Sequence, residues 1–240
     1  METESKNFAT THWTCVARSR GDGEVARAAL SELCESYYAP VQAFIRTTVR
    51  DADASQELTQ AFFVHVLSKK AFDGADPEKG KFRSYLLGAV KHFLHKTWEN
   101  TQAQKRGGGK VHVPIEPGTD TSPGIDPIDE KALSPDAEFD RRWALTMLAR
   151  SLEKLGTEME SEEKGELFRI LKPWLMGDHA GLRQGDAAVA LGINDNAVKV
   201  AIHRLRRRFR DMVKAEVAHT LSDPNQVEEE LRHLEAVLRR

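Results

Sequence analysis

The chain has 240 residues, of which 40% are hydrophobic, and a formal net charge of −2. This length accommodates one large or two small domains, and the near-neutral charge means that nucleic acid could bind only through local basic patches. We see no apolar run long enough to cross a membrane and no signal peptide, so we expect a cytoplasmic protein. Cys15 and Cys34 fit neither a disulfide framework nor a zinc motif, and we expect reduced thiols.

Helical periodicity dominates the N-terminal half, and alternating strand patterns are nearly absent. A short helix is predicted to end near residues 21–23, and a long one follows from Glu24 to Val49, in which Pro40 predicts a kink or break. Further amphipathic helices are predicted from Asp51 to Lys70 and from Phe82 to Gln104. The last helix and its flanks carry many basic residues: Lys81, Arg83, Lys91, His92, His95, Lys96, Lys105 and Arg106.

The composition changes after this basic helix, where Gly107, Gly108 and Gly109 end it. The following segment is rich in Pro, Gly, Asp, Thr and Ser, which predicts an extended, flexible linker. Helical periodicity resumes at Ala137 and returns once more in the tail from Asp223 to Arg240. We therefore predict an all-α fold with two small helical domains joined by a linker, plus a C-terminal helix. The predicted ranges are 1–106, 107–136, 137–220 and 221–240.

Residues 184–210 read as a helix, a tight turn and a second helix. Ala188 is small enough for close helix packing, and Gly192 suits the left-handed end of a helix. Ile193 is predicted to fill the corner, and Asn194 is a good N-cap for the second helix. This is the helix-turn-helix pattern, whose second helix lies in the major groove of DNA. The polar face of that helix carries Asp195, Asn196, Lys199, Val200, His203, Arg206, Arg207 and Arg210.

The second helix of this motif is strongly basic. Seven Lys or Arg residues stand against one acid, Asp211, between Lys199 and Lys214. A run of this kind is typical of a phosphate-binding stripe. It favours DNA binding over the alternative that the two helices merely expose a solvated, charged face.

Two stretches resemble the small extracytoplasmic-function (ECF) sigma factors of bacterial RNA polymerase. Residues 53–63, followed by 80–94, are similar to that family's D-L-x-Q-x-x-F helix and its F-R-x-W/Y-L motif with a basic helix. Residues 188–208 are similar to A-x-x-L-G-I-x-x-x-x-V-K-x-x-x-H/R-R-x-R-R. The resemblance covers most of residues 24–214 and implies a non-enzymatic subunit that directs core RNA polymerase to promoter DNA. It implies no cofactor and no metal.

The resemblance also implies roles for individual residues. One helix would dock on the clamp helices of the polymerase's largest subunit, although Leu58 and Phe62 could instead be core residues. The basic helix would hold the melted −10 element, with packing as the alternative for Trp98. The helix-turn-helix would bind the −35 element. The docking residues are Glu57, Leu58, Gln60 and Phe63; the −10 residues are Lys81, Arg83, Lys91, His92, Lys96 and Trp98; the −35 residues are Asn194, Asn196, Lys199, Val200, His203, Arg204, Arg206 and Arg207.

Several positions depart from the family pattern. Gln56 and Ala61 stand where acids are frequent, so the docking surface is less negative than usual. His92 and Lys96 replace Asn and Asp, which leaves the −10 sequence open, and Asn196 replaces a frequent Gly.

The main alternative is a stand-alone helix-turn-helix repressor or activator whose N-terminal helices dimerise or sense a ligand. Such a protein has no need for a second basic helix from Phe82 to Arg106. An enzyme is disfavoured, because the sequence shows no metal-ligand spacing, phosphate loop or nucleophile with its base. An anti-sigma factor is a further family expectation that no residue of the sequence requires.

Overall fold

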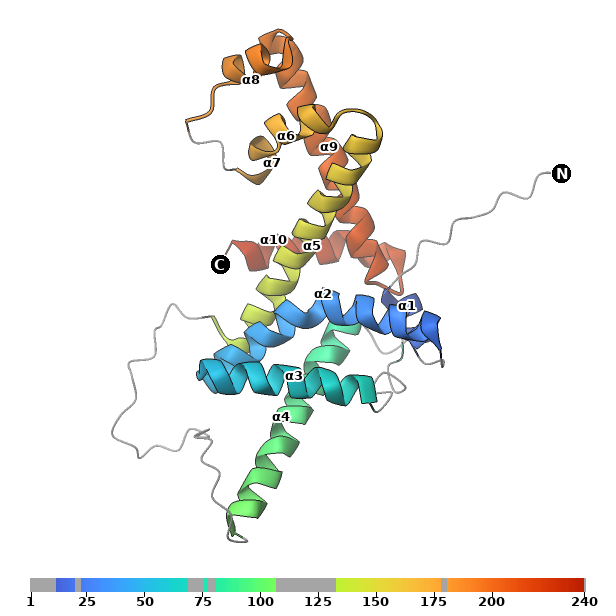
Figure 1. The fold of residues 1–240 in the computed structure, drawn as a ribbon, viewed down its shortest axis with the longest axis vertical. Coiled ribbons are helices and arrows are strands. Elements are labelled where there is room, and N and C mark those ends of the chain that lie inside the picture. The colour runs from blue at the N-terminus through green and yellow to red at the C-terminus, as the bar shows by residue number, and fades with distance from the viewer. Residues whose placement is uncertain are drawn as a thin grey trace, which may run out of the picture.

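The computed structural model describes residues 12–19, 23–68, 76, 81–106, 133–177 and 181–239. Within these residues every regular element is a helix, so the predicted all-α fold is confirmed (Figure 1). The helices are α1 (His12–Ser19), α2 (Glu24–Val49), α3 (Ala52–Ser68), α4 (Phe82–Arg106), α5 (Pro135–Ser161), α6 (Gly165–Leu171), α7 (Pro173–Met176), α8 (Gln184–Leu191), α9 (Asp195–His219), a 3-10 turn (Pro224–Gln226) and α10 (Val227–Leu238).

The N-terminal helices α2 and α3 follow each other across a tight corner. Arg50 ends α2 in the left-handed region at φ 59°, and the Asp51 carboxylate accepts a hydrogen bond from the Ala54 amide at 2.8 Å to begin α3. The predicted break at Pro40 is wrong, since α2 is continuous from Glu24 to Val49. Pro40 is buried within the packed part of α2, and burial of its neighbours offsets the lost backbone hydrogen bond.

The long helix α5 runs from beside α2 to the end of the molecule where α6, α7 and α8 lie (Figure 1). Ser134 is its N-cap and accepts a hydrogen bond from the Ala137 amide at 3.2 Å, while Pro135 occupies the first turn. Trp143, in the first half of α5, and Leu155, in the second half, are both fully buried. Because they lie in different hydrophobic clusters, α5 belongs to both cores.

The two clusters do not divide the chain at the predicted linker. The first cluster joins α1 to α4 with the first half of α5, the second half of α9 and α10. The second joins the last part of α5 to α6, α7, α8 and the first half of α9. Phe139, Trp143, Ala144 and Met147 of α5 are therefore buried together with the N-terminal helices. Most of the predicted linker, residues 107–132, lies outside the described residues.

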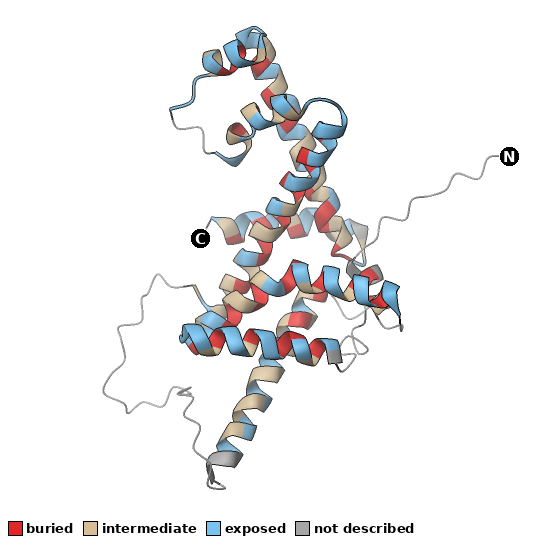
Figure 2. Cartoon of the chain, in the orientation of Figure 1, coloured by how far each residue is buried: buried red, intermediate tan, exposed pale blue. Residues whose placement is uncertain are grey.

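The tail helix α10 crosses α5 and α9 midway between the two ends of the molecule (Figure 1). It is shorter than the predicted span, and the preceding residues form a 3-10 turn. Leu234 and Val237 are buried, and so is the charged Glu230. In contrast, no residue from Lys91 to Ala103 in α4 is buried, so that part of α4 projects from the core (Figure 2).

Both cysteines, Cys15 and Cys34, are free thiols. Burial raises the pKa of each thiol to about 11. The thiolate is the reactive form, so both side chains are held in an unreactive state at neutral pH.

Candidate nucleic-acid interface

The helix-turn-helix forms at the predicted residues. Gly192 ends α8 in the left-handed region at φ 63°, and the Ile193 amide then donates to the Ala188 carbonyl at 3.0 Å. The Asn194 side chain caps α9 by accepting a hydrogen bond from the Ala197 amide at 2.8 Å. The prediction that Ile193 fills the corner is wrong, since its side chain is 37% exposed. The buried Ala188 is part of the packing between α8 and α9 instead.

Helix α9 separates an apolar face from an exposed one. Val198, Ile202 and Leu205 are buried against the second cluster, as their helical spacing predicts. Every residue predicted to contact the −35 element is exposed: Asn194, Asn196, Lys199, Val200, His203, Arg204, Arg206 and Arg207. The face of α9 that would enter a groove of DNA is therefore exposed rather than packed against the core.

The basic residues of α9 differ in what they contact. Arg208 binds Glu158 and Glu162, each at 2.6 Å, and its hydrogen bonds lower the pKa of Glu162 to about 2. Lys214 binds Glu228 at 2.7 Å. Arg206 donates to the Trp174 carbonyl at 3.1 Å. Among the described residues, neither Arg206 nor the other four cations of α9 make an ion pair: Lys199, Arg204, Arg207 and Arg210.

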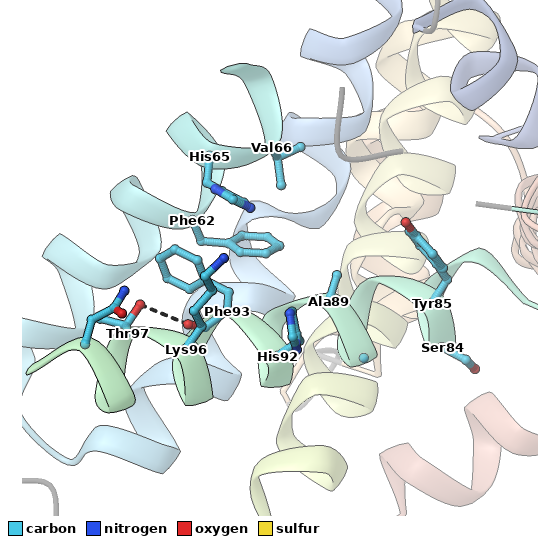
Figure 3. A pocket seen from close by; sticks show the side chains of 12 residues that line it. Phe62, His65, Val66, Ser84, Tyr85, Ala89, His92, Phe93, Lys96 and Thr97 are labelled. Atoms are coloured by element: carbon cyan, nitrogen blue, oxygen red, sulfur yellow. Dashed lines mark hydrogen bonds between the residues drawn. The ribbon is translucent and has the colours of Figure 1, made fainter. Parts of the chain in front are cut away.

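The residues predicted for the −10 element lie on separate surfaces around α4. His92 and Lys96 line an aromatic groove of about 780 Å³ between α3 and α4 (Figure 3). In this groove the rings of Phe62 and Phe93 meet edge to face, with centroids 5.5 Å apart. The ring of His65 lies beside that of Phe93, with centroids 5.7 Å apart. Phe62 is buried and Phe93 is half-buried, so Phe93 is the ring of this pair that could stack on an unpaired base, while Lys96 could bind an adjoining phosphate.

Lys91 and Trp98 lie on another side of α4, in a second groove of about 420 Å³. Leu58 and Glu57 of α3 line the same groove, and Lys91 binds Asp136 of α5 at 2.7 Å. Trp98 is half-buried there, which fits the packing alternative as well as base stacking. The structure thus brings two predicted docking residues next to two predicted −10 residues.

The predicted docking residues of α3 differ in exposure. Glu57 and Gln60 are exposed, Leu58 is half-buried, and Phe63 is buried and stacked on Tyr38 with centroids 5.4 Å apart. The predicted docking set omitted Val64 and Leu67, which are 63% and 51% exposed on α3. Their helical spacing from Glu57 and Gln60 was the signal that could have identified them.

Lys81 and Arg83, at the start of α4, are bound to acids of other helices. Both contact the buried carboxylate of Glu230 in α10, Arg83 through its Nε at 2.8 Å. Arg83 also contacts Asp140 of α5, and its guanidinium lies 4.9 Å from the Trp143 ring centroid. Burial alone would raise the pKa of Glu230, but the hydrogen bonds from Arg83 and Lys81 outweigh it and lower that pKa.

Comparisons of the chain with known protein families, with curated proteins and with solved structures found no match. None of the described helices has the length and apolar character needed to cross a membrane. The interpretation of the site therefore depends on its own geometry and on the motifs in the sequence.

Proposed function

We propose that this protein is a promoter-specificity subunit of bacterial RNA polymerase, of the ECF sigma-factor type. The observation that carries the proposal is the helix-turn-helix of α8 and α9, whose second helix exposes a cationic face. Lys199, Val200 and His203 are positioned to meet base edges in the major groove. Arg204 and Arg207 are positioned to bind phosphates beside them.

A second exposed surface supports a sigma factor over a stand-alone regulator. The projecting part of α4 lies at the opposite end of the molecule from α8 (Figure 1). Its aromatic groove, with His92 and Lys96 at the rim, has the chemistry to hold an unpaired strand. A sigma factor needs two separated DNA surfaces, one for duplex DNA and one for melted DNA, whereas a stand-alone repressor needs only the first.

The exposed side of α3 supports a polymerase-docking role. Glu57 and Gln60 are followed, at helical spacing along α3, by the exposed apolar side chains of Val64 and Leu67. An apolar strip with polar neighbours is the usual surface for a partner helix. In this proposal the protein has no catalytic residue and no cofactor, and its function lies in binding core polymerase and promoter DNA.

The first experiment is a pull-down with purified bacterial core RNA polymerase, followed by run-off transcription on a library of genomic fragments. Stable binding and defined start sites are the expected result. Two exposed valines provide a matched pair of variants. Val64→Asp on α3 is expected to abolish binding, while Val25→Asp, which changes a valine that is 69% exposed on α2, is expected to retain it.

Failure to bind polymerase would overturn the proposal. If the protein alone then gave a DNA footprint, the helix-turn-helix would belong to a stand-alone repressor or activator. Equal loss of binding in Val64→Asp and Val25→Asp would remove the docking role from α3 while leaving the DNA surfaces in place.

A further inference from the structure

Acidic side chains of the tail helix α10 contact Lys81 and Arg83, two cations that are predicted to bind the −10 element. The carboxylate of Glu230 is 0% exposed, while the side chains of Arg83 and Lys81 are 10% and 23% exposed. Glu229, also on α10, lies 3.8 Å from Lys81. The two acids come from a helix about 150 residues away in the chain, so α10 docks on this surface through specific long-range contacts.

We propose that Lys81 and Arg83 form an anion site for a phosphate of single-stranded nucleic acid, and that α10 closes this site in the free protein. The proposal takes the identity of the ligand from the function proposed above. In the closed state Glu230 stands where the phosphate would bind. Opening requires α10 to leave the surface formed by α4, α5 and α9.

The geometry of the site suits an oxyanion with several acceptor oxygens. Arg83 donates from Nε to one oxygen of Glu230, and Lys81 contacts the other. A guanidinium and an ammonium group that converge in this way can bind a phosphate as well as a carboxylate. Asp140 and the Trp143 ring hold Arg83 in place from the side of α5, so its position does not depend on α10 alone.

The charge of the site changes when α10 leaves. With α10 docked, the positive charges of Lys81 and Arg83 face the carboxylates of Glu229, Glu230 and Asp140. His233 of α10 also lies 3.2 Å from Asp140. When α10 leaves, Glu229 and Glu230 leave with it, and Lys81 and Arg83 face Asp140 alone. The site then has one uncompensated positive charge, which attracts a phosphate and releases a counterion. Docked α10 therefore opposes strand binding by charge as well as by occupancy.

Helix α10 is suited to reversible docking. It has 12 residues, a length at which an isolated helix is marginally stable in water. The 3-10 turn Pro224–Gln226 separates it from α9. Its buried apolar side chains, Leu234 and Val237, hold it closed until a ligand or partner with differential affinity for the open state is present.

The test compares two acids of α10 in the full-length chain. Glu230→Gln removes the buried charge, while Glu228→Gln removes an exposed one that pairs with Lys214 and does not contact the site. Binding of a labelled single-stranded DNA oligonucleotide of mixed sequence is measured by fluorescence anisotropy over a salt series. Glu230→Gln is expected to bind several-fold more tightly, with a salt slope steeper by about 1. Glu228→Gln is expected to match the wild type.

A third variant checks that the gain comes from this site. Adding Lys81→Gln to Glu230→Gln is expected to return the salt slope to the wild-type value, since the freed charge is then removed. Equal binding by the Glu230→Gln, Glu228→Gln and wild-type proteins would overturn the proposal and make the cluster a permanent structural contact.

Hydrogen exchange of the wild-type protein gives a readout that does not depend on how the variants fold. The amides of α10 are expected to lose protection when the oligonucleotide saturates the protein, while those of α5 keep theirs. Undiminished protection of α10 in the bound protein would overturn the proposal.

The two proposals fail separately. If core polymerase does not bind but Glu230→Gln strengthens oligonucleotide binding and α10 opens, the closed anion site stands and the sigma-factor proposal falls. If polymerase binds and directs transcription while α10 stays protected, the sigma-factor proposal stands and the role of α10 falls.

Discussion

Two basic regions of this protein differ in whether their positive charges are paired with acidic side chains. At the start of α4, Lys81 and Arg83 are held by buried or half-buried acids from α10 and α5. On α9, Lys199 and Arg207 are exposed and make no ion pair with any described residue. Both regions are basic and both were predicted to bind DNA. A basic run therefore predicts where positive charge lies, but only the packing decides whether that charge is available to a ligand.

The same contrast occurs within α9 itself. Arg207 is exposed to solvent, while its neighbour Arg208 binds Glu158 of α5 and Glu162, the C-cap of that helix. A rotation of about 100° along the helix separates a side chain that points outward from one that faces another helix. The following predictions test this difference between free and paired cations, from the largest expected effect to the smallest.

The largest expected effect is on stability. Arg83→Ala leaves the buried carboxylate of Glu230 with Lys81 as its remaining partner, and we expect the free energy of unfolding to fall by about 3 kcal/mol. Arg207→Ala removes an exposed, unpaired cation and is expected to change it by less than about 0.5 kcal/mol. Urea denaturation followed by circular dichroism measures both. A similar fall in the free energy of unfolding for both variants would contradict the difference between paired and free cations.

Lys199→Ala is expected to weaken discrimination between DNA sequences by about 1–3 kcal/mol, because it would remove the base contact proposed for α9. Stability should not change, since Lys199 is exposed and forms no ion pair within the described residues. Competition binding of the polymerase complex to cognate and scrambled duplexes measures the effect. A uniform loss of affinity for both duplexes would instead place Lys199 on a phosphate.

Neighbouring arginines give a matched pair for phosphate binding. Arg207→Ala is expected to reduce the salt slope of DNA binding by about 1, because a free cation that neutralises a phosphate is removed. Arg208→Ala is expected to leave the slope unchanged, since this side chain is held by acids of α5. The slopes come from binding isotherms over a salt series. A reduced slope for Arg208→Ala would show that DNA displaces those acids.

The smallest expected effect is a pH dependence at the junction of α2, α5 and α9. Burial lowers the pKa of His219, and the negative charge of Glu216 partly opposes this shift. Lys154, Arg150 and Glu32 are the other charged groups near the ring. The folded state therefore favours the neutral ring. The resulting stability is fully present above the ordinary histidine pKa of about 6.5, and is lost as the pH falls below that value toward the lowered pKa.

Thermal unfolding between neutral and mildly acidic pH measures this effect. His219→Gln is expected to flatten the decline seen in the wild-type protein. His95→Gln, which changes an exposed histidine of α4, is the control and is expected to keep it. An unchanged decline in His219→Gln would assign the pH dependence to other groups.

The features of the candidate site that are local in the chain were predictable from the sequence. Gly192 and Asn194 end and begin helices by interactions within a few residues, and both roles are confirmed. The apolar spacing of Val198, Ile202 and Leu205 likewise predicted the buried face of α9. An exposed face for α9 followed from the same periodicity, because the two sides of an amphipathic helix are complementary.

Features that depend on distant neighbours were not predictable in this way. Pro40 lies in a continuous helix and Ile193 remains partly exposed, because the packing around each position outweighs its local tendency. The predicted −10 residues are divided among three places: two grooves and the contact with α10. This division also depends on which side of α4 faces α3, α5 or α10.

The sequence by itself determined the helices, the helix-turn-helix and the location of the basic runs, since each of these depends on spacing within one or two helical turns. Only the tertiary structure decided which cations are free. Arg83 and Glu230 are separated by 147 residues, and no local pattern relates them. Their pairing requires α5 to bring α4 and α10 together. A buried ion pair forms only where the fold places both charges within one interface that is closed to water.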